Sequence, residues 1–422
     1  MAEKVKLTKS KVDALQFPAS GQIIVWDKDL PGFGLRLTPG CKAYVAQARV
    51  NGKTRRVKLG THSPSFTAEN ARKKAIKELS EMAQGVDPAE EKRLDQATAA
   101  TLKDVVDGYV KDRRDKLKPS TVANIAMHLN TNFSDWAKKP FVSITRDMVA
   151  ARHTEITDRS PAQADQAFRV LRALLNHARA CYRPDGVAIM QENPVDVLNR
   201  NQRGLWNGVK ARENRIPDGR TGAGWNFLRT TGTDPFQTTI GRTSADLMSF
   251  ILLTGVRLRE ATGLTWDRVN LDEGWFHLPD PKNRNPVTLP LSEAAVKILK
   301  DRPRINEFVF PSRDKEGCLR DARAILRKLS KVVGEDVCAH DLRRTFTNVA
   351  MKSCKIELWK VKMLTNHKLS GDVTIEHYSD KKDLRFLKPE TEKVSQWIVE
   401  QAKIAAAQNV VPIEKARKVR HA

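Results

Sequence analysis

The chain has 422 residues, of which 40% are hydrophobic and 29% are charged, a mixture typical of globular proteins rather than disordered ones. Lysine and arginine number 74 against 50 aspartates and glutamates, which gives a formal net charge of +24. Such a surplus favours a polyanionic partner, most often nucleic acid, over a ribosomal protein, a membrane-surface protein or a merely basic surface. The length exceeds what one hydrophobic core usually fills and predicts about three domains.

The cysteines and the apolar runs exclude several other classes. The five cysteines are far apart and form no C-x-x-C pair, which argues against a disulfide framework and against a zinc knuckle. The opening stretch MAEKVKLTKSKV is charged and lacks the apolar core of a signal peptide. No apolar run reaches membrane-spanning length. We therefore expect a cytoplasmic protein with no membrane partner.

Residues 1–90 are predicted to form a small antiparallel sheet followed by one helix. Three segments within 23–50 alternate in the manner of strands, and Asn51-Gly52 is a strong signal for a two-residue hairpin turn. A helix is expected over 67–84, where Gly85 ends it.

The strand after the hairpin turn carries a dense set of cations. They are Lys53, Arg55, Arg56 and Lys58. A two-stranded ribbon fits the major groove of DNA, so these residues are candidate DNA contacts, and the alternative is a solvated strand face. Alternation along the strand aims Arg55 and Arg56 to opposite faces, so about half of the set should contact DNA.

Residues 87–100 are polar and rich in alanine and glutamate, which is typical of a linker. Residues 101–200 repeat apolar positions at helical spacing, with a helix start at Ser160-Pro161, and are predicted to form a helical domain. A basic run within it contains Arg113 and Arg114, which either form a solvated face or contact DNA.

Residues 215–389 are predicted to form a mainly helical domain with one short sheet, whose strands run over 275–278 and 287–291. Residues 390–422 are expected to form an amphipathic helix and a basic tail. The apolar stripe of this helix includes Val394, Trp397 and Ile398, and it needs an apolar partner. That partner is either the chain's own domain or a neighbouring copy.

Four segments of the third domain carry ionisable groups in an order that rarely arises by chance. In chain order they hold Arg257 with Glu260, Lys282, His340 with Arg343, His367, and Tyr378. Each motif alone is weak evidence for a catalytic site, because H-x-x-R occurs in many proteins and a tyrosine near a C-terminus usually serves packing. Together they supply two arginines, three further donors and one nucleophile, without a cluster that has metal-ligand spacing.

These segments resemble the tyrosine recombinase, or phage integrase, family. TGVRLREATGLTWDRVNL is similar to the family's first arginine motif, HDLRRTF to its His-x-x-Arg motif and HYSD to its nucleophile motif. The opening, from DLPGFGLRLTPG to GVDP, resembles the arm-binding domain of prophage and genomic-island integrases. The resemblance implies an arm-type DNA-binding domain (1–90), a helical core-binding domain (101–200), and a mixed α+β catalytic domain (215–389).

The chain departs from the family pattern at three positions. Arg259 stands where glycine usually precedes the acidic residue, Arg284 where glycine is frequent in the Lys282 turn, and Asn366 where glycine often precedes the second histidine. None of these changes replaces a residue to which the resemblance gives a catalytic role.

The resemblance implies a site-specific recombinase that joins Tyr378 to a DNA 3′ phosphate. Two arginines, Arg257 and Arg343, can clamp the phosphate oxygens and replace a metal ion, so no metal or other cofactor is expected. Lys282 would protonate the leaving 5′ oxygen, His340 would assist proton transfer from Tyr378, and His367 would donate a hydrogen bond to the phosphate. The phosphotyrosine conserves the energy of the broken bond, so rejoining needs no ATP.

The implied function is integration and excision of a prophage or genomic island. The expected partners are double-stranded DNA at core and arm sites, further copies of the chain in a tetramer on DNA, a host DNA-bending protein and an excision factor. The tail helix is expected to dock on a neighbouring protomer of that tetramer. The alternatives are a type IB topoisomerase, against which the first domain argues, and a non-catalytic DNA-binding regulator that has kept the fold.

Overall fold

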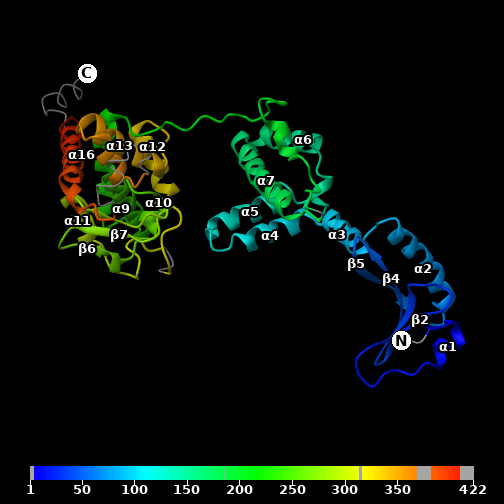
Figure 1. Ribbon diagram of the computed structural model, residues 1–422. Coiled ribbons are helices and arrows are strands. Elements are labelled where there is room, and N and C mark those ends of the chain that lie inside the picture. The colour runs from blue at the N-terminus through cyan, green and yellow to red at the C-terminus, as the bar shows by residue number, and fades with distance from the viewer. Residues whose placement is uncertain (1–3, 185, 313–315, 368–381, 409–422) are drawn as a thin grey trace. The chain divides into compact units, whose positions relative to one another are not determined.

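The structure is a computed structural model that describes residues 4–184, 186–312, 316–367 and 382–408 (Figure 1). The chain divides into two compact units, Met1–Lys210 and Ala211–Ala422. Within the described parts of the chain, no helix is both long enough and apolar enough to cross a membrane.

The N-terminal part of the first unit is a sheet covered on one face by a helix. Its elements are β1 (Lys4–Val5), α1 (Lys9–Ala14), β2 (Ile23–Asp27), β3 (Phe33–Thr38), β4 (Cys41–Val50), β5 (Lys53–Thr61) and α2 (Ala68–Ala83). The strands lie in the order β1-β2-β3-β4-β5; β1 pairs in parallel, and the remaining pairs are antiparallel. Asn51 and Gly52 have φ of 47° and 77°, the left-handed pair that the tight β4–β5 turn requires.

The strand register separates the two faces of this sheet. Leu35 lies opposite Tyr44, and both are buried in a core that includes Ala71 and Ala75 of α2. On the other face Gln47 lies opposite Arg56. The sheet therefore has one face packed on α2 and one face that carries polar side chains.

The segment predicted as a linker is a helix, which corrects that expectation. α3 covers Pro88–Ala99 and begins at Asp87, whose carboxylate accepts a hydrogen bond from Ala89 N at 2.9 Å. Proline occupies its first turn, where no backbone N–H is needed. This helix is mostly exposed, with Ala97 as its one buried residue, so its sequence is polar and has the composition of a linker.

The rest of the first unit is helical. Its elements are α4 (Leu102–Asp112), α5 (Pro119–Thr131), η1 (Phe141–Ser143), α6 (Arg146–Arg159), α7 (Pro161–Cys181) and η2 (Pro194–Leu198). α7 begins with Pro161 after Ser160, as predicted, although the Ser160 side chain makes no capping hydrogen bond. Phe168 and Leu171 of α7 lie fully buried among apolar residues of the other helices.

The second unit surrounds the buried helix α9 and carries a small sheet. Its elements are η3 (Asp218–Arg220), α8 (Thr221–Thr233), α9 (Thr239–Thr254), α10 (Leu258–Thr262), η4 (Trp266–Arg268), β6 (Val269–Asn270), β7 (Trp275–Leu278), β8 (Val287–Pro290), α11 (Glu293–Lys300), α12 (Arg323–Val333), α13 (Ala339–Asn348), the π-helical turn η5 (Val349–Ser353), α14 (Leu358–Leu364), η6 (Arg385–Leu387) and α16 (Lys388–Gln408). Every residue of α9 from Thr243 to Thr254 is buried. The predicted β7–β8 hairpin is present and pairs with β6 in an antiparallel sheet.

The C-terminal helix α16 packs against its own unit, which corrects the expectation that it docks on a neighbouring copy. Val394 and Ile398 are fully buried in the same core as α9. Gly222 of α8 lies so close to the α16 backbone that a side chain there would collide with Gln401. The apolar stripe of α16 thus has its partner within the chain.

Candidate active site

The site begins at the junction of α9 and α10, where the chain turns sharply. Gly255 ends α9 with φ of 66°, and a Cβ at this position would collide with the ring of Phe346 in α13. The turn leaves the Gly255 carbonyl free of the helix, and it accepts a hydrogen bond from Arg343 Nη1 at 2.7 Å. Arg257 follows immediately and forms the N-cap of α10.

Glu260 connects Arg257 with the turn that carries Lys282. One carboxylate oxygen accepts from the Arg257 backbone N–H at 3.0 Å. The other accepts from Arg257 Nη1 at 2.8 Å and from the Lys282 backbone N–H at 3.3 Å. The Glu260 side chain is only 7% exposed, so one shielded carboxylate orients both the arginine and the turn.

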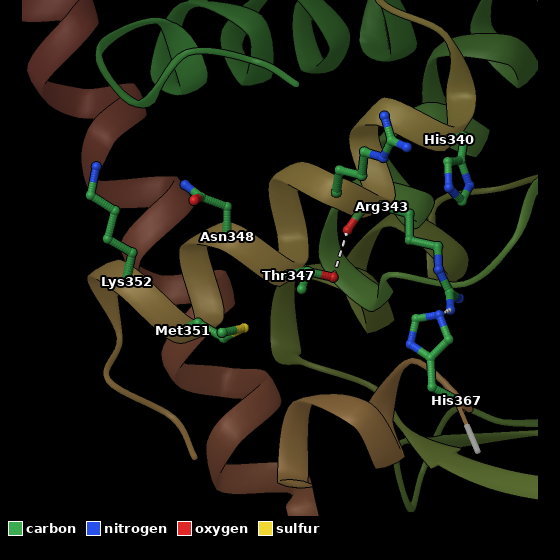
Figure 2. Close-up of a pocket in the computed structure, with 8 residues that line it drawn as sticks. His340, Arg343, Thr347, Asn348, Met351, Lys352 and His367 are labelled. Atoms are coloured by element: carbon green, nitrogen blue, oxygen red, sulfur yellow. Dashed lines mark hydrogen bonds between the residues drawn. The ribbon is translucent and has the colours of Figure 1, made fainter. Parts of the chain in front are cut away.

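Arg343 of α13 is almost fully buried, with 2% of its surface exposed. Besides Gly255, its guanidinium donates to the backbone carbonyl of Thr365 and to His367 Nε2, the latter at 3.2 Å. Burial and the nearby positive charge of Arg257 lower the pKa of Arg343 to about 10, so it remains protonated at neutral pH. Figure 2 shows its side chain reaching toward His367.

His367 is held as a neutral imidazole. The Thr365 hydroxyl donates to the Val361 carbonyl at 2.7 Å, so it accepts from His367 Nδ1 at 2.9 Å, which leaves Nε2 as the acceptor facing Arg343. Burial and the charges of Arg343 and Arg257 lower the pKa of His367 to about 4.

An open cavity of about 610 Å³ runs along α13 past these residues (Figure 2). Its lining consists of His340, Arg343, Arg344, Thr347, Asn348, Met351, Lys352 and His367. Partial burial and the charges of Arg344 and Arg343 lower the pKa of His340, so it is neutral at physiological pH. The cavity thus joins a buried cation with two neutral imidazoles.

The β7–β8 turn is fastened to the stretch before His367 by an asparagine clamp. We use this name for Asn283, Asn366 and the backbone carbonyl of Asn285. Asn283 Nδ2 donates to the backbone and side-chain oxygens of Asn366, each at 2.9 Å, and Asn366 Nδ2 donates to the Asn285 carbonyl at 3.2 Å. The clamp fixes the turn, on which Lys282 is exposed, to the residue that precedes His367.

Two departures from the family pattern have a backbone explanation. Arg284 has φ of 60° and Asn366 has φ of 46°, both in the left-handed region that glycine enters most easily. Asparagine is among the residues that tolerate this region best, and here it also gains a side chain that can hydrogen-bond. Arg259, the third departure, is exposed on α10.

Replacement of Asn366 by glycine tests the clamp. Asn366→Gly permits the same backbone angle but removes two side-chain hydrogen bonds, each worth about 1 kcal/mol. We expect strand cleavage to slow about tenfold while DNA affinity stays unchanged, measured with labelled duplex in single-turnover and gel-shift assays. Asn285→Ala, which keeps its backbone carbonyl, is the control and should cleave normally. Wild-type cleavage by Asn366→Gly would contradict a role for the clamp.

The candidate DNA contacts of the hairpin fall on different faces. Arg55 points to the helix side, where its guanidinium pairs with the buried carboxylate of Asp87 at 2.5 Å and so fixes the start of α3. Arg56 and Lys58 are exposed on the open face, with Arg56 Nε bound to Gln47 Oε1 at 2.7 Å. Lys53 is exposed at the start of β5.

The two arginines of the helical part also differ. The guanidinium of Arg113, which directly follows α4, lies 4.8 Å from the centre of the Tyr109 ring. Arg114 is exposed. Tyr378, predicted as the nucleophile, lies outside the described residues.

Sequence reasoning missed the residues that hold the site together. Gly255 and Thr365 each make a hydrogen bond to a predicted site residue, and Asn283 makes one to Asn366, the neighbour of His367. Their proximity in sequence to the motifs was the available signal, but nothing in the sequence specified which atoms would meet.

Comparison with known proteins identifies two regions of the chain. Residues 234–385 match the phage integrase family, and residues 7–95 match the arm DNA-binding domain. The chain carries an arm DNA-binding domain, followed in sequence by a phage integrase domain. The integrase domain contains the whole α9–α10 junction, the Lys282 turn, α13 and His367.

Two curated relatives extend the likeness over most of the chain. The prophage integrase IntZ of Escherichia coli (strain K12) is 26% identical over 363 residues, which span 83% of this chain and 85% of the relative. The prophage integrase IntF of the same organism is 23% identical, over 92% of this chain and 89% of the relative. Among solved structures, the Tn1549 transposon integrase in complex with a circular intermediate DNA matches with a TM-score of 0.50 at 13% identity, covering 66% of this chain and 95% of that one. This match supports the same integrase fold.

Proposed function

We propose that this chain is a site-specific tyrosine recombinase that cuts and rejoins DNA through a covalent bond between Tyr378 and a 3′ phosphate. The observation that carries the proposal is the position of His340, Arg343 and His367 on one cavity. Arg257, which precedes α10, is close enough that its charge adds to burial in lowering the pKa of Arg343 and of His367. Such an assembly suits a phosphodiester, whose oxygens are already negative and gain charge when a nucleophile attacks.

Arg343 is suited to act on the transition state because its geometry is set in advance. The carbonyls of Gly255 and Thr365 hold the guanidinium in a buried position, so little reorganisation is needed when charge develops on the phosphate. Arg257, oriented by Glu260, supplies a second fork of N–H donors. Two fixed arginines provide the charge stabilisation that many nucleases obtain from a metal ion, so we propose a metal-independent reaction.

The remaining groups supply hydrogen bonds and protons. His367 is neutral in the free protein, and a bound phosphate raises its pKa, so Nε2 takes a proton from solvent and donates it in a hydrogen bond to a phosphate oxygen, while Arg343 stays on its two backbone carbonyls. His340 takes the proton of Tyr378, whose ordinary pKa of about 10 leaves it neutral before attack. Lys282, exposed on a turn fixed by Glu260 and by the clamp, protonates the leaving 5′ oxygen.

The biological reaction follows from this chemistry and from the relatives. The phosphotyrosyl bond keeps the energy of the cut linkage, so a second strand can be joined without ATP. Because both curated relatives are prophage integrases, we propose that the chain integrates and excises a prophage or genomic island in the cytoplasm. Exchange between two duplexes requires four strand cuts, and we propose that a tetramer on DNA makes them, one per protomer. A host DNA-bending protein and an excision factor are the proposed accessory partners.

The arm DNA-binding domain would hold a separate DNA site with the open face of its sheet. Arg56 and Lys58 lie on this face, and Arg36 Nε is buried with no hydrogen-bond acceptor among the described residues. A narrow strand ribbon bearing these cations suits a major groove. Arg55 is committed to Asp87 and serves the fold of this region.

Covalent trapping on DNA tests the proposed reaction. A nicked suicide substrate lets the cut fragment diffuse away, so a recombinase should leave a DNA-linked band that survives denaturant, in EDTA as well as in Mg²⁺. A topoisomerase would form the same band but would relax supercoils without producing recombinants. Absence of the band under every condition would indicate a DNA-binding regulator, and loss of the band in EDTA with recovery in Mg²⁺ would refute the metal-independent mechanism.

A further inference from the structure

We propose that Asp112, His177 and Cys181 of the helical part form a binding site for a divalent transition-metal ion, with Zn²⁺ as the best fit. Asp112 is the last residue of α4, and His177 and Cys181 lie one turn apart at the end of α7. The site shares no residue with the proposed phosphate-binding set and does not depend on the proposed reaction. The spacing H-x-x-x-C within one helix gave no recognisable signal in the sequence, because the third donor comes from a different helix.

The distances among the three donor atoms suit one ion. His177 Nε2 lies 3.5 Å from Asp112 Oδ2 and 3.6 Å from Cys181 Sγ, and Cys181 Sγ lies 4.0 Å from Asp112 Oδ2. Zinc bonds of about 2.0 to 2.3 Å at tetrahedral angles place such atoms about 3.3 to 3.6 Å apart. Two of the three distances match this range. The third is wider, and the Asp112 side chain, 56% exposed, has room to close it by rotation.

The surroundings favour a cation at this position. α4 and α7 both end here, and the unpaired carbonyls at a helix C-terminus give it a partial negative charge. The His177 ring is held edge-on to the Tyr109 ring, with centroids 5.3 Å apart, so its nitrogen atoms have a fixed direction. Three protein donors at a partly exposed position leave a fourth coordination position open to water or to another donor.

Binding would release a proton and add a link between two helices that already pack together. The ion binds Cys181 as the thiolate, so the thiol proton passes to the buffer. The apolar core of α4 and α7 is complete without the three donors, so the apoprotein folds and the ion stabilises it further. Chelation should therefore lower the melting temperature without abolishing DNA cleavage.

Titration of the reduced, metal-free full-length chain with Co²⁺ tests the site. Cobalt in a tetrahedral site with a thiolate ligand gives a near-ultraviolet sulfur-to-metal band and strong visible bands, and Zn²⁺ should displace them. We expect one equivalent to bind, and Zn²⁺ to raise the melting temperature.

Variants of the ligands and of an unrelated cysteine make the test specific. Cys181→Ser should lose the sulfur-to-metal band, and His177→Gln and Asp112→Asn should each weaken binding about tenfold or more. Cys318→Ser, which changes a thiol in the other compact unit, should behave as the wild type. Absence of this band in the wild-type protein, or its persistence in Cys181→Ser, would contradict the metal site. The three residues would then be an Asp–His ion pair beside a free thiol.

Discussion

Tyr378→Phe is expected to abolish the covalent adduct while DNA affinity stays within a factor of two of the wild-type value. The substitution removes one oxygen atom, and that oxygen is the proposed nucleophile. Loss of a nucleophile that acts together with its partners typically reduces the rate by a factor on the order of 10⁴ or more, so no band should be visible on the suicide substrate. Binding should persist because the arginines and the arm domain still contact the phosphates.

The chain offers a convenient control for this experiment. Tyr182, which follows α7, is half-buried outside the integrase domain, and Tyr182→Phe should form the adduct at the wild-type rate. Digestion of the trapped wild-type complex should leave the DNA on the peptide that contains Tyr378. A band that persists in Tyr378→Phe would show that another residue attacks, and the assignment of the nucleophile would be wrong.

Arg343→Ala is expected to slow cleavage by a factor of 10² to 10³, with a much smaller change in DNA binding. Removal of one preorganised donor to a developing oxyanion costs roughly 2.7 to 4 kcal/mol in the transition state. The variant should also melt at a lower temperature, because the carbonyls of Gly255 and Thr365 lose their donor and each buried unpaired group costs about 1 to 3 kcal/mol.

A second substitution separates the kinetic effect from the structural one. Arg343→Lys keeps the charge but replaces the flat fork by a single ammonium, so it should lose most of the rate while recovering part of the stability. Arg259→Ala, which removes an exposed cation from α10, is the control and should leave both quantities unchanged. Equal losses of affinity and cleavage rate in the Arg343 variants would mean that this arginine only holds the DNA backbone.

Local signals in the sequence predicted much of the fold. The Asn51-Gly52 hairpin and the β7–β8 hairpin follow from turn chemistry and from alternation over a few residues, and the structure has both of them. The predicted linker failed because a capped, alanine-rich segment can form an exposed helix. The expected docking of α16 on another copy failed because an apolar stripe does not specify which apolar surface covers it.

The candidate site was predictable as a set of residues but not as an arrangement. The order of the motifs named Arg257, Arg343 and His367, yet their contacts join positions far apart in the chain: Arg343 lies 88 residues from Gly255. The clamp is less predictable still, since Asn283 and Asn366 are 83 residues apart and both stand in ordinary turn sequences. Such contacts depend on how the helices pack, and the pattern of one element does not contain that information.

The stretch 365–367 supports two parts of the candidate site at once. Thr365 and His367 contact Arg343, the proposed phosphate ligand, and Asn366 between them holds the turn of Lys282. A displacement of this stretch removes the supports of the arginine and of the proposed acid at the same moment. Under the proposed function, such a protomer would lose the arginine's support and the acid's position together, so it would not stay half active.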